Sequence, residues 1–203
     1  MNSCKKNSVA IHNVVTYDTV RIGNQTWMKY NLNVTTYRNG DAIPDVLEPE
    51  LWQILTTGAY CDYNNIADTG KIYGHLYNWY AVNDSRNLAP EGWHVASDSE
   101  WTVLTSYPGV NLKERGTQHW YPPNTGANDN NGFTALPGGS RNFDGPFPVD
   151  SLTGIGYDGS WWTSTSVDSA NAYYRGMRYN VTDAFRGTAN KNYAFSVRCV
   201  KDK

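Results

Sequence analysis

The sequence predicts a mixed α+β domain with short strands, two or three helices and long loops. Its 203 residues include 8 Trp, 15 Tyr and 5 Phe, so large rigid side chains fill the interior. The 18 Gly and 9 Pro indicate frequent turns between short segments. The composition shows no break along the chain, so we expect one domain over residues 14–203, after a polar tether over residues 1–13.

The clearest element is a short strand that runs into a helix within residues 92–104. Ser97 and Glu100 have the spacing of a capping box, which marks the first turn of a helix. Trp101 and Leu104 then share one face of that helix and are expected in the core. A Pro-Gly pair at residues 108–109 ends the helix.

Turn residues and hydrophobic periodicity predict the other elements. Gly-Asn at residues 23–24 and Asn-Gly at residues 39–40 predict hairpins over residues 19–28 and 35–44. The pattern of apolar and acidic residues predicts helices over residues 48–55 and 73–82. Alternation and β-forming residues predict strands over residues 60–63, 133–136, 161–165, 173–179 and 193–201.

The charge pattern argues against nucleic acid as a partner. Lys and Arg number 17 and Asp and Glu number 19, which leaves a net charge of -2 with the basic residues scattered. No apolar run reaches the length of a membrane span.

Cys4 stands in a polar N-terminal segment that looks like the end of a bacterial lipoprotein signal. On this interpretation Cys4 carries the lipid, and the protein touches a membrane only through that anchor. We then expect an extracytoplasmic protein, either an outer-membrane or cell-surface lipoprotein or a secreted one. The other interpretation is a stray Cys in a disordered terminus.

Cys61 and Cys199 both lie on predicted strands with their side chains directed inward. A disulfide between them and two separate buried thiols are both open, because pairing depends on the Cα separation.

The sequence contains none of the common catalytic or metal-binding motifs that we sought. A Gly-x-Ser-x-Gly elbow and a Cys-x-x-Cys pair are missing, and the 4 His share no ligand-like spacing. Paired carboxylates for glycoside cleavage stay open, since any two acidic residues can meet in space. Residues 127–132 fit the EF-hand template only in part, so a looser calcium site at Asp129 and a plain polar turn both remain.

Trp161 and Trp162 are adjacent, so they point to opposite faces of their strand. In a sheet buried on one side only, one ring stays outside the core, and we predict that it stacks on a glycan or a peptide. The alternative is that layers on both faces cover both rings. Residues expected to flank the site with polar groups are Arg141, Asn142, Asp144, Tyr173 and Arg175.

Six segments carry a resemblance to a known family. They are residues 23–28 (GNQTWM), 73–82 (YGHLYNWYAV), 92–101 (GWHVASDSEW), 132–139 (GFTALPGG), 161–165 (WWTST) and 195–200 (FSVRCV). Together they resemble the Fibrobacter succinogenes major paralogous domain, over about residues 15–202. That family is found in predicted lipoproteins and surface or secreted proteins of Fibrobacter and Bacteroidetes-type bacteria, which agrees with a lipid on Cys4. Members often carry a Cys where this chain has Ala89, which puts a Cys61–Cys199 pairing in doubt.

More distantly, residues 93–101 are similar to a segment of formylglycine-generating enzymes, whose fold is C-type-lectin-like. This resemblance implies an α+β, C-type-lectin-like fold with short twisted antiparallel sheets, two or three helices and long ordered loops. Oxidation by those enzymes needs a reactive Cys pair late in the chain. Here only Cys199 lies there, so we do not expect that activity.

Three functional hypotheses follow. The favoured one is an extracytoplasmic, lipid-anchored binding or adhesion module with a glycan or protein ligand, without a cofactor unless calcium binds. The second is a carbohydrate-active or other hydrolytic enzyme on the same scaffold, and the third is a structural surface protein. A deep cleft with perturbed titratable groups favours an enzyme, whereas a shallow aromatic patch favours a binder.

Overall fold

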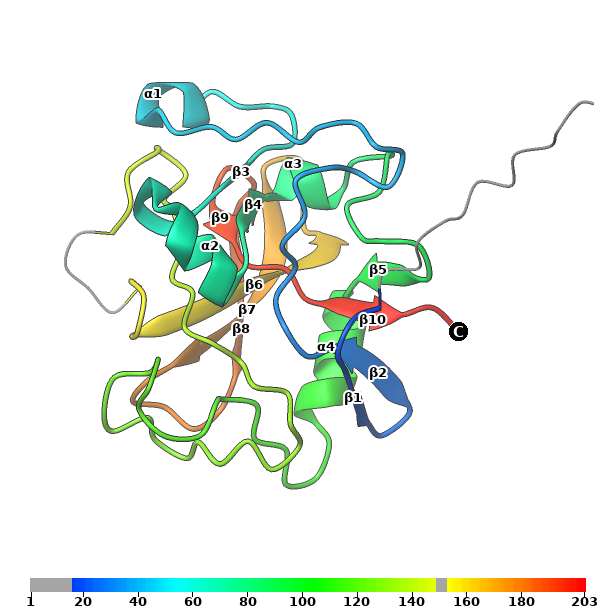
Figure 1. Cartoon of the computed structure of the whole chain (residues 1–203), viewed down its shortest axis with the longest axis vertical. Helices are drawn as coiled ribbons and strands as arrows, with labels where there is room; N and C mark the ends of the chain where they lie inside the picture. Colours follow the sequence, from blue (N-terminus) through cyan, green and yellow to red (C-terminus); the bar gives the residue numbers. More distant parts are fainter. Residues whose placement is uncertain (1–15, 149–152) are drawn as a thin grey trace, which may run out of the picture.

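The computed structural model describes residues 16–148 and 153–203, which form three small antiparallel sheets, short helices and long loops (Figure 1). This is the mixed α+β architecture that the sequence predicts, but with four α-helices among the described residues in place of two or three. Cys4 and the predicted tether over residues 1–13 lie outside the described residues. Among the described residues, no helix is long and apolar enough to cross a bilayer.

The first sheet joins the two ends of the described chain. Its strand order is β1 (Thr19–Ile22), β2 (Gln25–Met28), β10 (Cys199–Lys201) and β5 (Trp93–Val95). In the hairpin Ile22 pairs with Gln25, so Gly23 and Asn24 form a two-residue loop, as predicted. Gly23 has a φ of 60°, a conformation that glycine adopts without strain. The C-terminal strand β10 therefore lies between this hairpin and β5 (Figure 1).

Helix α4 (Asp98–Thr105) follows β5 as the sequence predicts. The Ser97 hydroxyl accepts from the Glu100 amide, and the Glu100 carboxylate accepts from the Ser97 amide at 2.8 Å. Trp101 and Leu104 are buried on the inner face of the helix. The helix ends at Thr105, three residues before the Pro-Gly pair.

The second sheet corrects one predicted helix. Its strands are β3 (Tyr60–Cys61), β4 (Leu76–Asn78) and β9 (Ala194–Phe195), with β4 in the centre. A helix over residues 73–82 was therefore wrong for residues 76–78. All residues of β4 are buried, so the strand has no polar alternation to reveal it. The short helix α3 (Trp79–Val82) follows β4, because the Asn78 side chain caps it.

The third sheet consists of β6 (Asp158–Ser166), β7 (Asn171–Arg178) and β8 (Phe185–Asn190), with β7 in the centre. It appears in yellow and orange behind β9 in Figure 1. Strand β6 extends the predicted segment 161–165 at both ends, and β7 begins before the predicted segment 173–179 but ends one residue earlier, whereas β8 was not expected. The sequence of β8, FRGTAN, contains one large apolar residue and one Gly, which hides its strand character.

Several other elements are shorter than predicted or unexpected. Helix α1 (Pro49–Trp52) is shorter than the helix expected over residues 48–55. The predicted hairpin over residues 35–44 and the predicted strand over residues 133–136 each form isolated bridges without strands. Helix α2 (Ala67–Tyr73) and the 3-10 turn η1 (Tyr63–Asn65) were not predicted.

Aromatic rings fill the interior. Trp27, Trp52, Trp101, Trp161 and Trp162 have no exposed surface. The rings of Trp27 and Trp101 lie 5.0 Å apart and those of Trp101 and Trp161 lie 6.0 Å apart. Because each aromatic ring buries a large area in a rigid side chain, short strands and long loops suffice for a core.

Buried cations tie the long loops to this core. The Lys113 ammonium donates to the carbonyl oxygens of Thr125, Arg178 and Val181. Burial lowers its pKa to about 8. The Arg141 guanidinium uses all three nitrogens to donate to the carbonyl oxygens of Val46, Leu47 and Gly145. These cations donate hydrogen bonds to loop carbonyl oxygens that would otherwise be buried without partners.

Candidate functional site

The predicted stacking role of Trp161 and Trp162 is wrong. Both rings are fully buried, because packed layers cover both faces of β6. Trp161 donates its indole N–H to Asn31 Oδ1 at 2.8 Å, and Trp162 donates to the Tyr77 carbonyl at 2.9 Å. Neither ring has a face open to a ligand.

Arg141, Arg175 and Tyr173 are also unavailable as a polar flank. Arg141 is buried against the Trp52 ring at 4.4 Å, and all its nitrogens donate to the backbone. Arg175 donates from Nη2 to Asp98 Oδ1 at 2.7 Å. The Tyr173 ring lies 3.7 Å below the Arg186 guanidinium. These residues hold loops and α4 in place.

Asn142 lines a pocket, whereas Asp144 is not among its lining residues. The pocket has a volume of about 340 Å³ and opens over one face of the third sheet, and we call it the third-sheet pocket. Asn142 lines it, and the negative charge of Asp144 acts on Tyr193, another lining residue. The residues that line it are Ser140, Asn142, Thr153, Asp158, Ser160, Asn171, Tyr174, Arg178, Phe185, Thr188, Ala189, Asn190, Tyr193 and Phe195.

A row of aromatic rings runs along this pocket. It begins at Phe143, which is 46% exposed, and each ring contacts the next. The centroid separations are 5.4 Å for Phe143–Tyr193, 5.5 Å for Tyr193–Phe195, 4.9 Å for Phe195–Tyr174 and 6.0 Å for Tyr174–Phe185. Phe143 lies outside the lining and Phe195 is buried at 4%, so Tyr174, Phe185 and Tyr193 supply the partly exposed ring surface of the pocket.

Two glycines make room for this row. A side chain at Gly176 would collide with the Phe185 ring, and one at Gly187 would collide with the Tyr174 ring. The rings therefore lie over bare backbone of the neighbouring strand, and the pairings Gly176–Phe185 and Tyr174–Gly187 fix their position.

Asp158 is the acidic group of the pocket. Its Oδ1 accepts from Ser160 Oγ at 2.8 Å, and its Oδ2 lies 3.8 Å from Arg178 Nε. The Arg178 guanidinium in turn covers the Phe185 ring at 5.0 Å. Burial raises the pKa of Asp158 to about 6, although the Ser160 hydrogen bond and the Arg178 charge lower it. At neutral pH the carboxylate is ionised and has acceptor capacity to spare.

The described residues that line the pocket include a single carboxylate and several aromatic and amide side chains. Asp158 is the one carboxylate among the described residues that line it, whereas glycoside hydrolysis usually uses a pair. A perturbed carboxylate beside aromatic rings, Asn side chains and an Arg is instead a typical set for hydroxyl-rich ligands.

The cysteines are separate buried thiols. Cys61 in β3 and Cys199 in β10 are both free, so the alternative of a disulfide between them is wrong. They belong to different core clusters, which explains why they do not meet. Burial raises the pKa of each thiol to about 12, so both are uncharged and unreactive.

Asp129 holds a turn. Its two carboxylate oxygens accept from the Thr134 amide at 2.8 Å and the Thr134 hydroxyl at 2.7 Å. Within residues 16–148 and 153–203, no three His, Cys, Asp or Glu side chains group as a metal site. The polar-turn interpretation of residues 127–132 thus accounts for this carboxylate.

Sequence reasoning missed most of the pocket. Asp158, Ser160 and Trp162 alternate on one face of β6, but two of them are small or polar and resemble a turn. The available signal was the run of Tyr174, Gly176 and Arg178 on the same face of β7. Phe185 escaped notice because β8 itself was not predicted.

Comparison with known proteins gives one match. A family model described as the Fibrobacter succinogenes major domain matches residues 20–201, a span that contains the whole third-sheet pocket. No curated protein and no solved structure matches the chain significantly.

Proposed function

The chain belongs to the Fibrobacter succinogenes major domain family, and on that premise we propose that it is a binding module whose third-sheet pocket takes a neutral, hydroxyl-rich ligand such as a glycan. The observation that carries this proposal is the aromatic row from Phe143 to Phe185 that leads to Asp158 and Arg178. A sugar ring offers an apolar C–H face to an aromatic ring and hydroxyl groups to polar side chains.

The polar groups suit hydroxyls. Asp158 accepts from hydroxyl donors, and Arg178, which is 46% exposed at its side chain, donates to hydroxyl oxygens. Asn142 and Asn171 line the pocket and supply both donors and acceptors. Because the carboxylate and the guanidinium partly balance each other, the site favours an uncharged ligand over an ion.

The proposal includes an extracytoplasmic location with a lipid on Cys4, supported by the polar N-terminal segment that precedes the domain. Its test is to express the chain behind a lipoprotein signal sequence in a bacterium that processes lipoproteins. The wild type is expected in the membrane fraction, and Cys4→Ser in the soluble fraction. Equal partition of the two proteins contradicts the anchor.

The proposal also includes a C-type-lectin-like fold. Its support is the pairing of β2 with β10, which joins the N-terminal and C-terminal segments in one sheet. Long loops between small antiparallel sheets agree with that architecture. An experimental structure in which β2 and β10 do not pair would reject it.

The ligand is tested by a glycan-array screen of the full chain, followed by calorimetry with the best neutral glycan. Tyr193→Ala removes the second ring of the aromatic row and is expected to weaken binding about tenfold, a loss of about 1.4 kcal/mol. Tyr30→Ala is the matched control, because Tyr30 is 51% exposed and lies outside the pocket.

Asp158→Asn provides the second variant. It keeps the shape of the side chain but removes the charged acceptor, so it is expected to weaken binding about tenfold at pH 7. Wild-type affinity should also fall as the pH drops through about 6, because protonation has the same effect. Failure of the folded protein to bind any glycan contradicts the proposal.

A further inference from the structure

Arg198 is a buried cation with one unused nitrogen. Its side chain is 1% exposed. Nε donates to Asn31 Oδ1 at 3.1 Å, and Nη1 donates to the carbonyl oxygens of Met28, Lys29 and Phe133. Nη2 donates to no atom of the described residues. Arg141, by contrast, uses all three of its nitrogens.

No carboxylate of the described residues forms an ion pair with Arg198. The negative charge of Asp129 raises the pKa of Arg198 without forming an ion pair with it. The carboxylate oxygens of Asp129 accept hydrogen bonds from Thr134. Burial lowers the pKa of Arg198 to about 9, yet the guanidinium stays charged at neutral pH. Nη2 is not among the buried side-chain atoms that lack a partner, so it is open to solvent, and an anion that replaces water there would gain a direct charge-assisted hydrogen bond.

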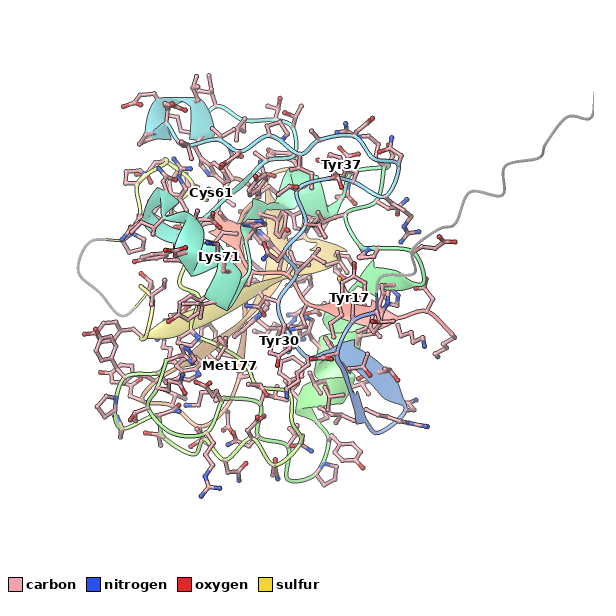
Figure 2. All side chains as sticks on the ribbon, viewed as in Figure 1. Tyr17, Tyr30, Tyr37, Cys61, Lys71 and Met177 are labelled. Atoms are coloured by element: carbon pink, nitrogen blue, oxygen red, sulfur yellow. The ribbon has the colours of Figure 1, made fainter. Side chains whose placement is uncertain are left out.

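Arg198 lines a pocket of about 510 Å³, which we call the Arg198 pocket. It lies between the segment after β2, helix α2 and the loop that carries Glu114 and His119. Figure 2 shows two of its lining residues, Lys71 on α2 and Tyr30 on the segment after β2. The pocket shares no lining residue with the third-sheet pocket.

The charges around the Arg198 pocket favour an anion of single charge. Lys29 and Lys71 line it together with Arg198 and with one carboxylate, Glu114. Lys71 is paired with Asp68 at 2.8 Å, so Lys29 and Arg198 are the cations left to face a ligand. Glu114 is engaged by His119, whose Nδ1 lies 2.9 Å from both carboxylate oxygens. Glu114 nevertheless repels a second negative charge, which disfavours a dianion such as phosphate.

Apolar side chains line the same pocket. Tyr30 and Ile72 are each 51% exposed, and Leu136 is buried at 8%. Large apolar side chains left open beside an unpaired buried cation provide a place for the hydrocarbon part of a ligand. The volume is in the range of small organic molecules.

We propose that the Arg198 pocket binds a small organic monocarboxylate with an apolar substituent. The carboxylate accepts from Nη2 of Arg198, with Lys29 as a further positive charge, and the apolar part packs on Tyr30 and Ile72. The C-terminal carboxylate of a peptide would present the same chemistry. So would a carboxylate on an otherwise uncharged chain.

The test compares three probes by calorimetry with the full chain: phenylacetate, its neutral analogue phenylacetamide, and inorganic phosphate. Phenylacetate is expected to bind at least tenfold more tightly than the amide, because only the acid pairs with the guanidinium. Equal affinity for acid and amide overturns the proposal. Phosphate that binds as tightly as phenylacetate overturns the choice of a monocarboxylate.

Variants locate the binding. Lys29→Gln and Tyr30→Ala are each expected to weaken phenylacetate binding several-fold. Lys201→Gln, which changes an exposed Lys outside the pocket, is the matched control and should leave binding unchanged. Arg198→Lys removes the unused nitrogen, but it also removes core hydrogen bonds, so its folding is checked by circular dichroism. Unchanged affinity in both Lys29→Gln and Tyr30→Ala overturns the proposal.

Tyr193→Ala separates this site from the third-sheet pocket. It is expected to weaken glycan binding and to leave phenylacetate binding unchanged, since Tyr193 does not line the Arg198 pocket. A loss of phenylacetate binding in Tyr193→Ala would assign the carboxylate to the third-sheet pocket and overturn the proposal. Failure of every glycan probe would leave the phenylacetate result intact.

Discussion

Asp158 and Arg178 face each other across β6 and β7, with Oδ2 and Nε 3.8 Å apart. This separation is too long for a tight ion pair, so the carboxylate keeps acceptor capacity and the guanidinium rests partly on the Phe185 ring at 5.0 Å. The pair therefore stands at one end of the aromatic row as two polar groups that a ligand can bridge.

Asp158→Asn should change how stability depends on pH. The folded pKa of Asp158 is raised to about 6 from 3.8, so its stabilising contribution is fully present below pH 3.8 and is lost as the pH rises through about 6. The loss is about 3 kcal/mol at pH 7. Relative to the wild type, Asp158→Asn should thus gain about this amount between pH 4 and pH 7.

The measurement is urea unfolding of both proteins at several pH values. Ser164→Asn changes an exposed residue of the same strand and serves as the control, with no pH-dependent gain expected. The expected result is a difference in unfolding free energy between the two proteins that changes from pH 4 to pH 7. If the difference is the same at both pH values, Asp158 is not a buried acid with a raised pKa.

His94→Gln should weaken the attachment of the C-terminal segment at low pH. His94 bonds to Glu100 Oε1 and to Asp202 Oδ1, each at 2.7 Å. Burial lowers its pKa, but the bonds to Asp202 and Glu100 outweigh burial and raise it above its ordinary value. The stabilisation is therefore present below about pH 6.5 and is lost as the pH rises through the folded pKa.

Because the His94 side chain is 41% exposed, the effect on the free energy of unfolding should stay below about 1 kcal/mol. Proton titration by NMR gives the pKa directly. A His94 pKa at or below 6.5 would contradict the charged bridge.

Gly187→Ala should disturb the aromatic row. Its added methyl group collides with the Tyr174 ring, so we expect a loss of about 1 to 3 kcal/mol in stability together with weaker glycan binding. Ser164→Ala, at an exposed position of β6, should have neither effect. Thermal unfolding and calorimetry check both expectations, and an unchanged melting temperature in Gly187→Ala would show that the ring does not lie over the glycine.

Ser97→Ala should destabilise α4. The substitution leaves the Glu100 amide without its side-chain acceptor, which typically costs about 1 kcal/mol. Val103→Ala, on the exposed side of the same helix, should be close to neutral. Urea unfolding distinguishes the two, and equal effects of both variants would contradict the capping box.

Cys61 and Cys199 should both react as free thiols once the protein is unfolded. Alkylation in denaturant without a reductant is expected to label both positions, while the native protein protects them because both are buried. Peptide mass spectrometry reads the labels. Absence of label at both positions before reduction would reveal a disulfide.

Local signals predicted the parts of the fold that local chemistry determines. Ser97 and Glu100 lie three residues apart, so their capping box is visible in the sequence, and Gly23 marks its hairpin in the same way. The strand at residues 76–78 was not visible, because its burial arises from pairing with β9, more than a hundred residues later. Tertiary context determined that segment.

The pocket was less predictable for the same reason. Asn142 and Asp144 were proposed beside a ligand, and the structure places Asn142, but not Asp144, in the lining of the third-sheet pocket. The prediction for Trp161 and Trp162 was wrong. The two-residue period of a strand places the rings on opposite faces, but it does not show whether both faces are covered. Asp158 becomes a site residue only through burial and through Arg178 on the paired strand.

Chemical-shift mapping tests whether the third-sheet pocket binds a neutral glycan. The tightest neutral sugar from the array is titrated into the isotopically labelled full chain. The account predicts backbone shifts concentrated at residues 158–160, 174–178 and 185–190, with little change at residues 29–33 and 70–74 of the Arg198 pocket. Shifts concentrated elsewhere, or none at a saturating sugar concentration, would contradict it.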